Sequence, residues 1–155
     1  MKVGIITQPL YTNYGGLLQN YALQQVLEQL GHEVITIDQN NVPPKKWKIY
    51  VSCLKIFLVN LLKKGIKRQY PCVLNKYQEI YIKQHTDSFI NKYIKHSNKL
   101  DKTDEFSDFV KENNLEGLIV GSDQVWRPKY NRNVLHSFFD FAANINIKHI
   151  AYAAS

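Results

Sequence analysis

The strongest constraint on the fold is a strand, a loop, a helix and a second strand within the first 38 residues. Residues 2–7 form a compact apolar run that predicts a buried strand, and a polar loop follows it. From about residue 16 to residue 30, apolar side chains recur at helical spacing until Gly31, and residues 33–38 predict a second strand. This order predicts two parallel strands joined by a right-handed crossover.

The rest of the chain continues the alternation of helices and short strands. Such alternation predicts an α/β, Rossmann-like fold with a mainly parallel sheet flanked by helices. The length of 155 residues suits one domain over residues 1–155. The predicted elements are, in order, helices over residues 45–64 and 73–84, a segment at 89–96 that fits a helix or an extended chain, a helix with Thr103 as its N-cap, and strands at 116–120 and 148–153.

Positive charge is concentrated in a basic helical segment over residues 42–102. This segment holds 14 of the 20 Lys/Arg and 3 of the 13 Asp/Glu, a net charge of +11, whereas the remainder carries −4. Its first helix has an apolar stripe that could dock on an anionic membrane surface. Nucleic-acid binding has no motif to support it. The favoured interpretation is that the stripe, from Trp47 to Leu61, packs on the sheet or on another domain while the lysines stay solvated.

Cysteine and histidine spacing predicts neither a metal site nor a disulfide scaffold. Cys53 and Cys72 are separated by 18 residues and form no C-x-x-C pair, which is typical of a reduced, cytoplasmic protein. The 5 histidines show no ligand spacing and are expected at the surface or beside strands. The apolar run at residues 49–62 contains Lys55 and is shorter than the ~20 residues of a membrane-spanning helix.

The loop after the first strand places a glycine pair at the start of the first helix. Gly15 and Gly16 allow backbone N–H groups to approach a ligand, and a helix N-terminus favours negative charge. A tight turn alone could explain the glycines, but the neighbouring Asn13 and Gln19 favour a ligand site. A dinucleotide site is disfavoured because G-x-G-x-x-G is absent and the loop is too long, so Asp38 is interpreted as an ordinary strand-end residue.

A second polar motif follows the third predicted strand. Gly121 permits an unusual turn, Ser122, Asp123 and Gln124 offer hydrogen-bonding groups, and Trp126 offers a flat apolar face. Sugar sites combine these features. An Asx-turn made by the aspartate, with the tryptophan in the core, explains the same residues equally well. The motif lacks G-x-S-x-G, so it is not a nucleophile elbow.

Taken together, these segments resemble the polysaccharide pyruvyl transferase family. The resemblance implies a two-domain fold like that of the GT-B glycosyltransferases, in which this chain is the N-terminal domain and the C-terminal domain is absent. The chain stops at the end of its last predicted strand, which fits a cut domain. The matching segments are Lys2–Thr7, Asn13–Gly16, Leu18–Gln19, Tyr21–Gln24, Gly31, the strand ending at Asp38, Val120–Trp126, Pro128, Phe138–Phe141 and Ile150–Ser155.

The family resemblance also implies a reaction and its participants. A pyruvyl group passes from phosphoenolpyruvate to two hydroxyls of a sugar and forms a pyruvate ketal in surface-polysaccharide biosynthesis, with no cofactor besides the donor substrate. Acceptors of the family are often lipid-linked oligosaccharides, which suits a cytoplasmic protein at the inner face of the membrane with peripheral membrane contact and no nucleic-acid partner. The family's phosphoenolpyruvate-binding cations lie mostly in the second domain, so this chain alone is expected to be inactive.

The resemblance assigns roles to residues of both motifs. Asp123 is the candidate catalytic residue, which would bind or deprotonate the acceptor hydroxyl. Two alternatives remain open: a non-catalytic remnant or binding module from a truncated gene, and a GT-B domain that uses a nucleotide sugar. The candidate substrate-binding residues are Asn13, Tyr14, Gly15, Gly16 and Gln19 at the first helix, and Gly121, Ser122, Gln124 and Trp126 in the second motif.

Overall fold

The structure is a computed structural model that divides the chain into two compact units. The first unit comprises residues 1–41 and 82–155, and the second comprises residues 42–81. The first unit contains the sheet and both polar motifs. The residues described are 1–40, 46–62, 69, 75–122, 124–128, 131 and 133–154.

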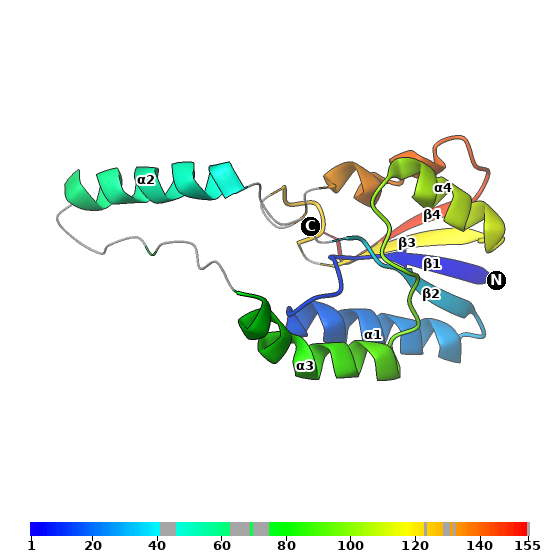
Figure 1. Ribbon diagram of the computed structural model, residues 1–155. Helices are drawn as coiled ribbons and strands as arrows, with labels where there is room; N and C mark the ends of the chain where they lie inside the picture. The colour runs from blue at the N-terminus through cyan, green and yellow to red at the C-terminus, as the bar shows by residue number, and fades with distance from the viewer. Residues whose placement is uncertain are drawn as a thin grey trace. The chain divides into compact units, whose positions relative to one another are not determined.

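A four-stranded sheet in the order β2-β1-β3-β4 forms the centre of the first unit (Figure 1). All three strand pairings are parallel, and Ile6 lies opposite both Ile37 and Val120. The prediction of an α/β fold with a mainly parallel sheet is therefore confirmed. The strands are β1 (Lys2–Ile6), β2 (Glu33–Ile37), β3 (Gly117–Gly121) and β4 (Lys148–Tyr152).

Helices cover both faces of this sheet, with α1 on one face and α4 on the other (Figure 1). The covered faces follow from strand alternation, because Ile5 and Ile119 pack beneath α1 whereas Ile6 and Val120 pack beneath α4. The helices are α1 (Tyr14–Gln29), α2 (Lys46–Leu62), α3 (Lys76–Tyr93) and α4 (Thr103–Glu112), with short 3-10 helices η1 (Val134–Phe138) and η2 (Asp140–Ala142).

The ends of α1 agree with the sequence signals to within about two residues. Asn13 is the N-cap, and its side chain accepts a hydrogen bond from the Gly16 N–H. After the helix, Gly31 adopts the left-handed conformation with a φ of 81°, which glycine reaches without steric cost. Its N–H donates to the Glu28 carbonyl, so this glycine ends the helix as predicted.

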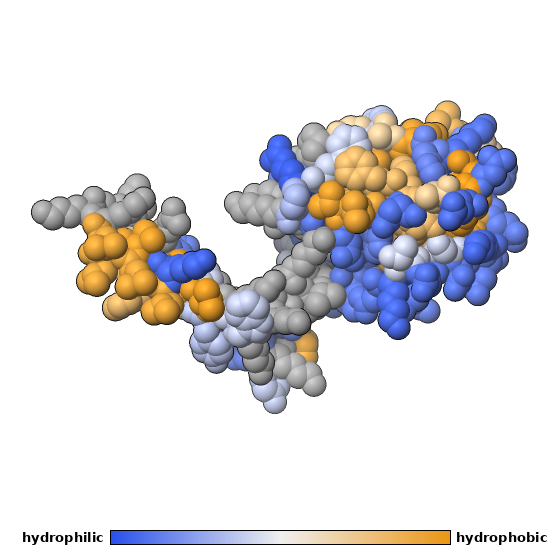
Figure 2. Space-filling view, turned by 90° about the horizontal axis from the view of Figure 1, so that it is seen from above, coloured by the Kyte–Doolittle hydropathy of each residue, from blue (hydrophilic) through white to orange (hydrophobic). Residues whose placement is uncertain are grey.

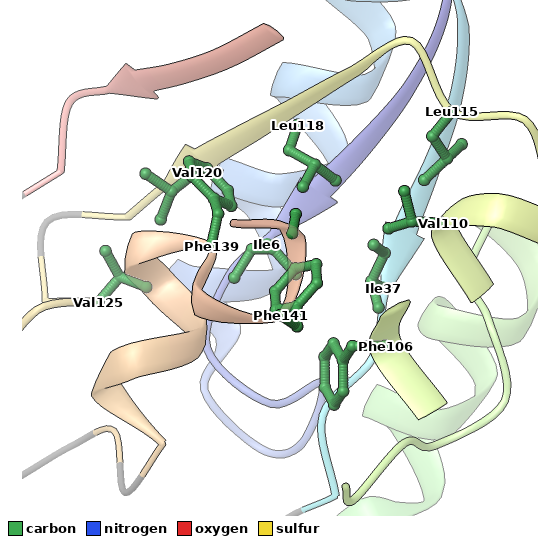
Figure 3. Packing of buried hydrophobic residues seen from close by; sticks show 11 residues of the cluster. Ile6, Ile37, Phe106, Val110, Leu115, Leu118, Val120, Val125, Phe139 and Phe141 are labelled. Carbon is green, nitrogen blue, oxygen red and sulfur yellow. The ribbon is translucent and has the colours of Figure 1, made fainter. Parts of the chain in front are cut away.

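The main hydrophobic core lies between the sheet and α4. Phe106 is fully buried and packs beside Phe141, with ring centroids 5.2 Å apart. Figure 3 shows both rings gathered against side chains of the strands. The buried members of this core are Ile6, Ile37, Phe106, Val110, Leu115, Leu118, Val120, Val125, Phe139, Phe141 and Ala142.

The segment after α3 runs beside β2. Parallel bridges join Thr36 to His96 and Gln39 to Leu100, which extends the sheet by two isolated contacts. The alternatives left open for residues 89–96 are thereby resolved, because the helix continues to Tyr93 and an extended chain follows.

The predicted N-cap of α4 is wrong by one residue. Thr103 is the first helical residue, and Lys102 occupies the N-cap position. Glu105 explains the difference, because its carboxylate accepts the backbone N–H of Asp101 at 2.8 Å and that of Lys102 at 3.4 Å. The glutamate in the first turn therefore binds the backbone N–H groups just before the helix, and the helix begins at Thr103 with Lys102 as its N-cap.

Candidate functional site

The two polar motifs open at the same edge of the sheet. β1 and β3 are parallel neighbours, and Ile6 lies opposite Val120 near their carboxyl ends. The chain leaves β1 toward α1 and leaves β3 toward the second motif. Side chains far apart in the sequence therefore meet at the carboxyl edge, where ligands bind in sheets of this type.

The first turn of α1 presents backbone N–H groups beside an ordered amide. Asn13 accepts the Gly16 N–H at 3.3 Å through Oδ1 and donates through Nδ2 to Gln8 Oε1 at 2.8 Å. Tyr14 and Gly15 are exposed, and the first turn carries no acidic side chain. No acidic side chain of this turn therefore neutralises the partial positive charge at the start of the helix.

The end of β3 approaches α1 closely. A Cβ atom added to Gly121 would lie 2.9 Å from Leu23 Cδ2, so the glycine allows this contact. Ser122 is buried, and its hydroxyl accepts the N–H of the half-buried Gln124 at 3.4 Å. Asp123, the candidate catalytic residue, lies outside the described residues.

A groove of about 580 Å³ lies between α1 and the strands β3 and β4. Three predicted site residues, Gln19, Gly121 and Ser122, line it together. No Lys, Arg, Asp or Glu occurs among its described lining residues. Its polar end thus lies near both motifs, while the rest of it is apolar. The lining residues are Gln19, Ala22, Leu23, Val26, Leu27, Leu30, Ile119, Gly121, Ser122, Ile150, Tyr152 and Ala153.

Trp126 does not line this groove. It stacks on Phe138, with ring centroids 5.3 Å apart and an interplanar angle of 8°, and its Nε1 donates to the Ser137 carbonyl at 3.3 Å. Buried Asn131 fixes this loop, since its Nδ2 donates to Val125 O at 2.9 Å and to Ser137 Oγ at 2.8 Å. No local sequence pattern indicates these contacts.

Comparison with known protein families identifies the chain. A model of the family described as polysaccharide pyruvyl transferase matches residues 13–155. This chain belongs to the polysaccharide pyruvyl transferase family. A search of curated proteins found no match. The resemblance found in the sequence is therefore confirmed, and the match includes both polar motifs of this pyruvyl transferase family chain.

Two buried residues that sequence reasoning gave no role hold the loop that follows β1. Asp38 Oδ1 accepts the Leu10 N–H at 3.0 Å, and Gln39 Nε2 donates to the Thr7 carbonyl at 2.9 Å. Both residues directly follow β2, the strand next to β1, and that position was the signal that could have identified them. They fix the loop that leads to the first turn of α1.

Burial raises the pKa of Asp38 above its usual value, against the opposing effects of the Leu10 hydrogen bond and the Lys99 charge. Ionisation is therefore less favourable in the folded than in the unfolded chain. The stability contributed by this group is fully present below the unfolded-state pKa of about 3.9 and is lost as the pH rises through the folded-state pKa.

Asp38→Asn is expected to raise the free energy of unfolding near neutral pH and to change it little at about pH 3. The asparagine keeps an oxygen for the Leu10 N–H but cannot ionise. Urea unfolding across this pH range measures the difference. Asp38→Ala, which cannot ionise either but also removes the acceptor, should be less stable than Asp38→Asn by about 1–3 kcal/mol at each pH. An Asp38→Asn effect that is independent of pH contradicts the assignment.

His136 differs from the expectation that the histidines lie at the surface or beside strands. It is buried in η1, where its ring lies 4.4 Å from that of Phe106. Nε2 is 3.3 Å from Thr103 Oγ1, and within the described part of the chain Nδ1 has no hydrogen-bond partner. Burial lowers the pKa of His136, and the Asp140 charge opposes this effect. The neutral imidazole therefore belongs to the aromatic core.

Among the described residues, no group of three His, Cys, Asp or Glu side chains could hold a metal ion. Within the described ranges, no helix has the length and apolar character needed to cross a bilayer.

Proposed function

We propose that this protein transfers a pyruvyl group from phosphoenolpyruvate to two hydroxyls of a sugar and forms a cyclic pyruvate ketal during the synthesis of surface polysaccharide. Membership of the pyruvyl transferase family supports the class of reaction. Gln19, Gly121 and Ser122 line one groove, and this observation supports the location of the site. These residues come from motifs about a hundred positions apart, and both motifs fall within the family match.

Ketal formation replaces the phosphate on C2 of the enolpyruvyl group with two sugar oxygens. The methylene carbon takes up a proton and becomes a methyl group, the bond from C2 to the phosphate oxygen breaks, and two bonds from C2 to sugar oxygens form. The hydroxyls lose two protons, of which one balances the proton on the methyl group and the other leaves with phosphate. The reaction needs a base, an acid and positive charge near the donor.

Within this proposal, Asp123 binds or deprotonates the acceptor hydroxyl. Gln19 and Ser122 hydrogen-bond the sugar at the polar end of the groove, beside Gly121. Asn13, Tyr14, Gly15 and Gly16 orient an anionic group of a substrate at the start of α1, where the first turn carries no acidic side chain. Gln124 and Trp126 shape the loop beside the pocket.

The donor requires positive charge at its binding site. Phosphoenolpyruvate carries a phosphate and a carboxylate, yet the described lining of the groove has no Lys or Arg. This supports a second, GT-B-like domain as the source of the cations, with the acceptor bound by the domain described here. We therefore also propose that the 155-residue chain alone does not catalyse the transfer.

The test is an assay of the full-length gene product with phosphoenolpyruvate and a panel of methyl glycosides, with nucleotide sugars offered in parallel. We expect phosphate release and a glycoside whose mass increases by one pyruvate less one water. Asp123→Ala should lower the rate by about a hundredfold or more, as expected for loss of a general base. Gln19→Ala should lower it less, because the amide would bind the acceptor without taking its proton.

Gln25→Ala is the matched control, since the Gln25 side chain bonds Glu28 on the same helix and does not line the groove. Its rate should equal that of the unaltered protein. Transfer from a nucleotide sugar but not from phosphoenolpyruvate would refute the proposed donor. Full activity of Asp123→Ala would remove that residue from the mechanism, and turnover by the 155-residue chain would show that no second domain is needed.

A further inference from the structure

Helix α2 exposes a broad apolar face that plays no part in the site described above. Apolar side chains gather along α2 in Figure 2. Leu54 is 60% exposed and Phe57 is 54% exposed, near the middle of the helix. The exposed residues that define this apolar face of α2 are Trp47, Tyr50, Val51, Leu54, Phe57, Leu58, Leu61 and Leu62.

The helical period separates this face from a more buried one. At 3.6 residues per turn, the exposed apolar positions fall within an arc of about 140° centred near Leu54. The half-buried residues, which include Ile49, Cys53 and Ile56, fall on the opposite side. Lys55 is exposed, and the helical positions of Lys46 and Lys55 lie on the two flanks of the apolar arc. An apolar face between lysines is the pattern of a helix that lies in a membrane interface.

The second unit carries almost only positive charge. Residues 42–81 contain nine Lys/Arg and a single acid, Glu79, for a net charge of +8. Each lysine close to an anionic bilayer strengthens binding roughly fivefold. A surface with this charge therefore complements acidic lipid headgroups.

Aromatic residues of the same unit suit the headgroup region. Trp47 and Tyr50 are exposed on the apolar face of α2, and Tyr77 and Tyr81 are exposed on the first turns of α3. Tyrosine and tryptophan concentrate at membrane interfaces because each combines an apolar ring with a polar group. Nucleic acid would instead favour a face on which the lysines are central and the large aliphatic side chains are absent.

A protein partner, whether a second copy of this chain or another domain, is a poor occupant of the face. Interfaces between proteins are depleted in lysine, and two units of charge +8 would meet with like charges together. We propose that the apolar face of α2 docks on the surface of an anionic lipid bilayer. This docking surface belongs to α2 and takes no part in the transfer reaction.

Sedimentation of the full chain with lipid vesicles tests this docking. One set of vesicles contains three parts phosphatidylcholine and one part phosphatidylglycerol, and the other contains phosphatidylcholine alone. We expect binding to the anionic set to be at least tenfold stronger, and to weaken when salt is raised from about 0.1 M to about 1 M. In a Trp126→Phe protein, the emission of Trp47, then the only tryptophan, should shift to shorter wavelength on binding.

Leu54→Glu places a charge at the centre of the apolar face and should weaken binding to anionic vesicles at least tenfold. Leu135→Glu is the matched control, because Leu135 is 68% exposed in η1 and its replacement changes the net charge equally. This control should change binding less than twofold. Lys55→Gln, on the flank of the face, should weaken binding to the anionic set by roughly fivefold.

Equal binding of the Leu54→Glu and Leu135→Glu proteins would overturn the proposal, because charge alone would then explain the attraction. Failure of the unaltered chain to bind anionic vesicles would overturn it as well. If light scattering then showed a dimer that Leu54→Glu dissociates, the face would be a contact between protein chains. Circular dichroism of each variant establishes that the helices have formed.

Discussion

Replacing Phe106 by alanine is expected to lower the free energy of unfolding by about 3–5 kcal/mol. The side chain is fully buried between α4 and the sheet, and its ring packs against His136 at 4.4 Å and Phe141 at 5.2 Å. Alanine would remove these contacts and leave a cavity that neighbouring aromatic rings on short 3-10 helices cannot easily close. The total free energy of unfolding of a domain is about 5–15 kcal/mol, so this loss is a large part of its stability.

Urea unfolding followed by circular dichroism measures this effect. Phe138→Ala removes the same atoms from a ring that is 57% exposed and stacked on Trp126, and should cost about 1 kcal/mol. If the two alanine variants lost similar free energies of unfolding, the assignment of Phe106 to the centre of the core would be wrong. If the Phe106→Ala protein does not fold, Phe106→Leu gives a smaller, measurable loss that should still exceed that of Phe138→Ala.

Elements with a strong local signal could be predicted from the sequence. The strand at residues 2–6 has a continuous apolar run, and α1 has both helical periodicity and Gly31 at its end. The parallel arrangement followed from the strand, helix, strand order, because a crossover helix joins strands in that way. The proximity of Gln19 and Ser122 could be predicted from this arrangement, because the loops that follow parallel strands lie at the same edge of the sheet.

Features that depend on distant polar partners could not be predicted. The position of Asp38 after β2 was visible in the sequence, but its partner was not, because the spacing between Asp38 and Leu10 matches no local turn or cap. Trp126 was equally compatible with the core and with a sugar pocket, and its position depends on how Asn131 and Ser137 fix the loop. The burial of His136 depends on Phe106, thirty positions earlier. Such contacts are set by tertiary packing, which propensity and periodicity do not describe.

The polar network between α1 and β2 is the clearest of these long-range contacts. Gln24 is buried, and its Nε2 donates to Thr36 Oγ1 and to the Lys95 carbonyl, both at 2.7 Å. Its Oε1 accepts the Lys95 N–H at 3.1 Å, and Asn20 bonds the same threonine hydroxyl. One amide therefore joins the helix, the strand and the extended segment that follows α3.

Gln24→Ala is expected to lower the free energy of unfolding by about 2–4 kcal/mol, because it leaves buried polar groups without partners and opens a cavity. Amide hydrogen exchange should also accelerate at Lys95, whose N–H loses its acceptor. Gln25→Ala is the matched control: this neighbour is half-buried and bonds only within its own helix, to Glu28, so its loss should stay near 0.5 kcal/mol. Equal losses at the two positions, or unchanged exchange at Lys95, would mean that the segment after α3 is held to the sheet by its backbone bridges rather than by this glutamine.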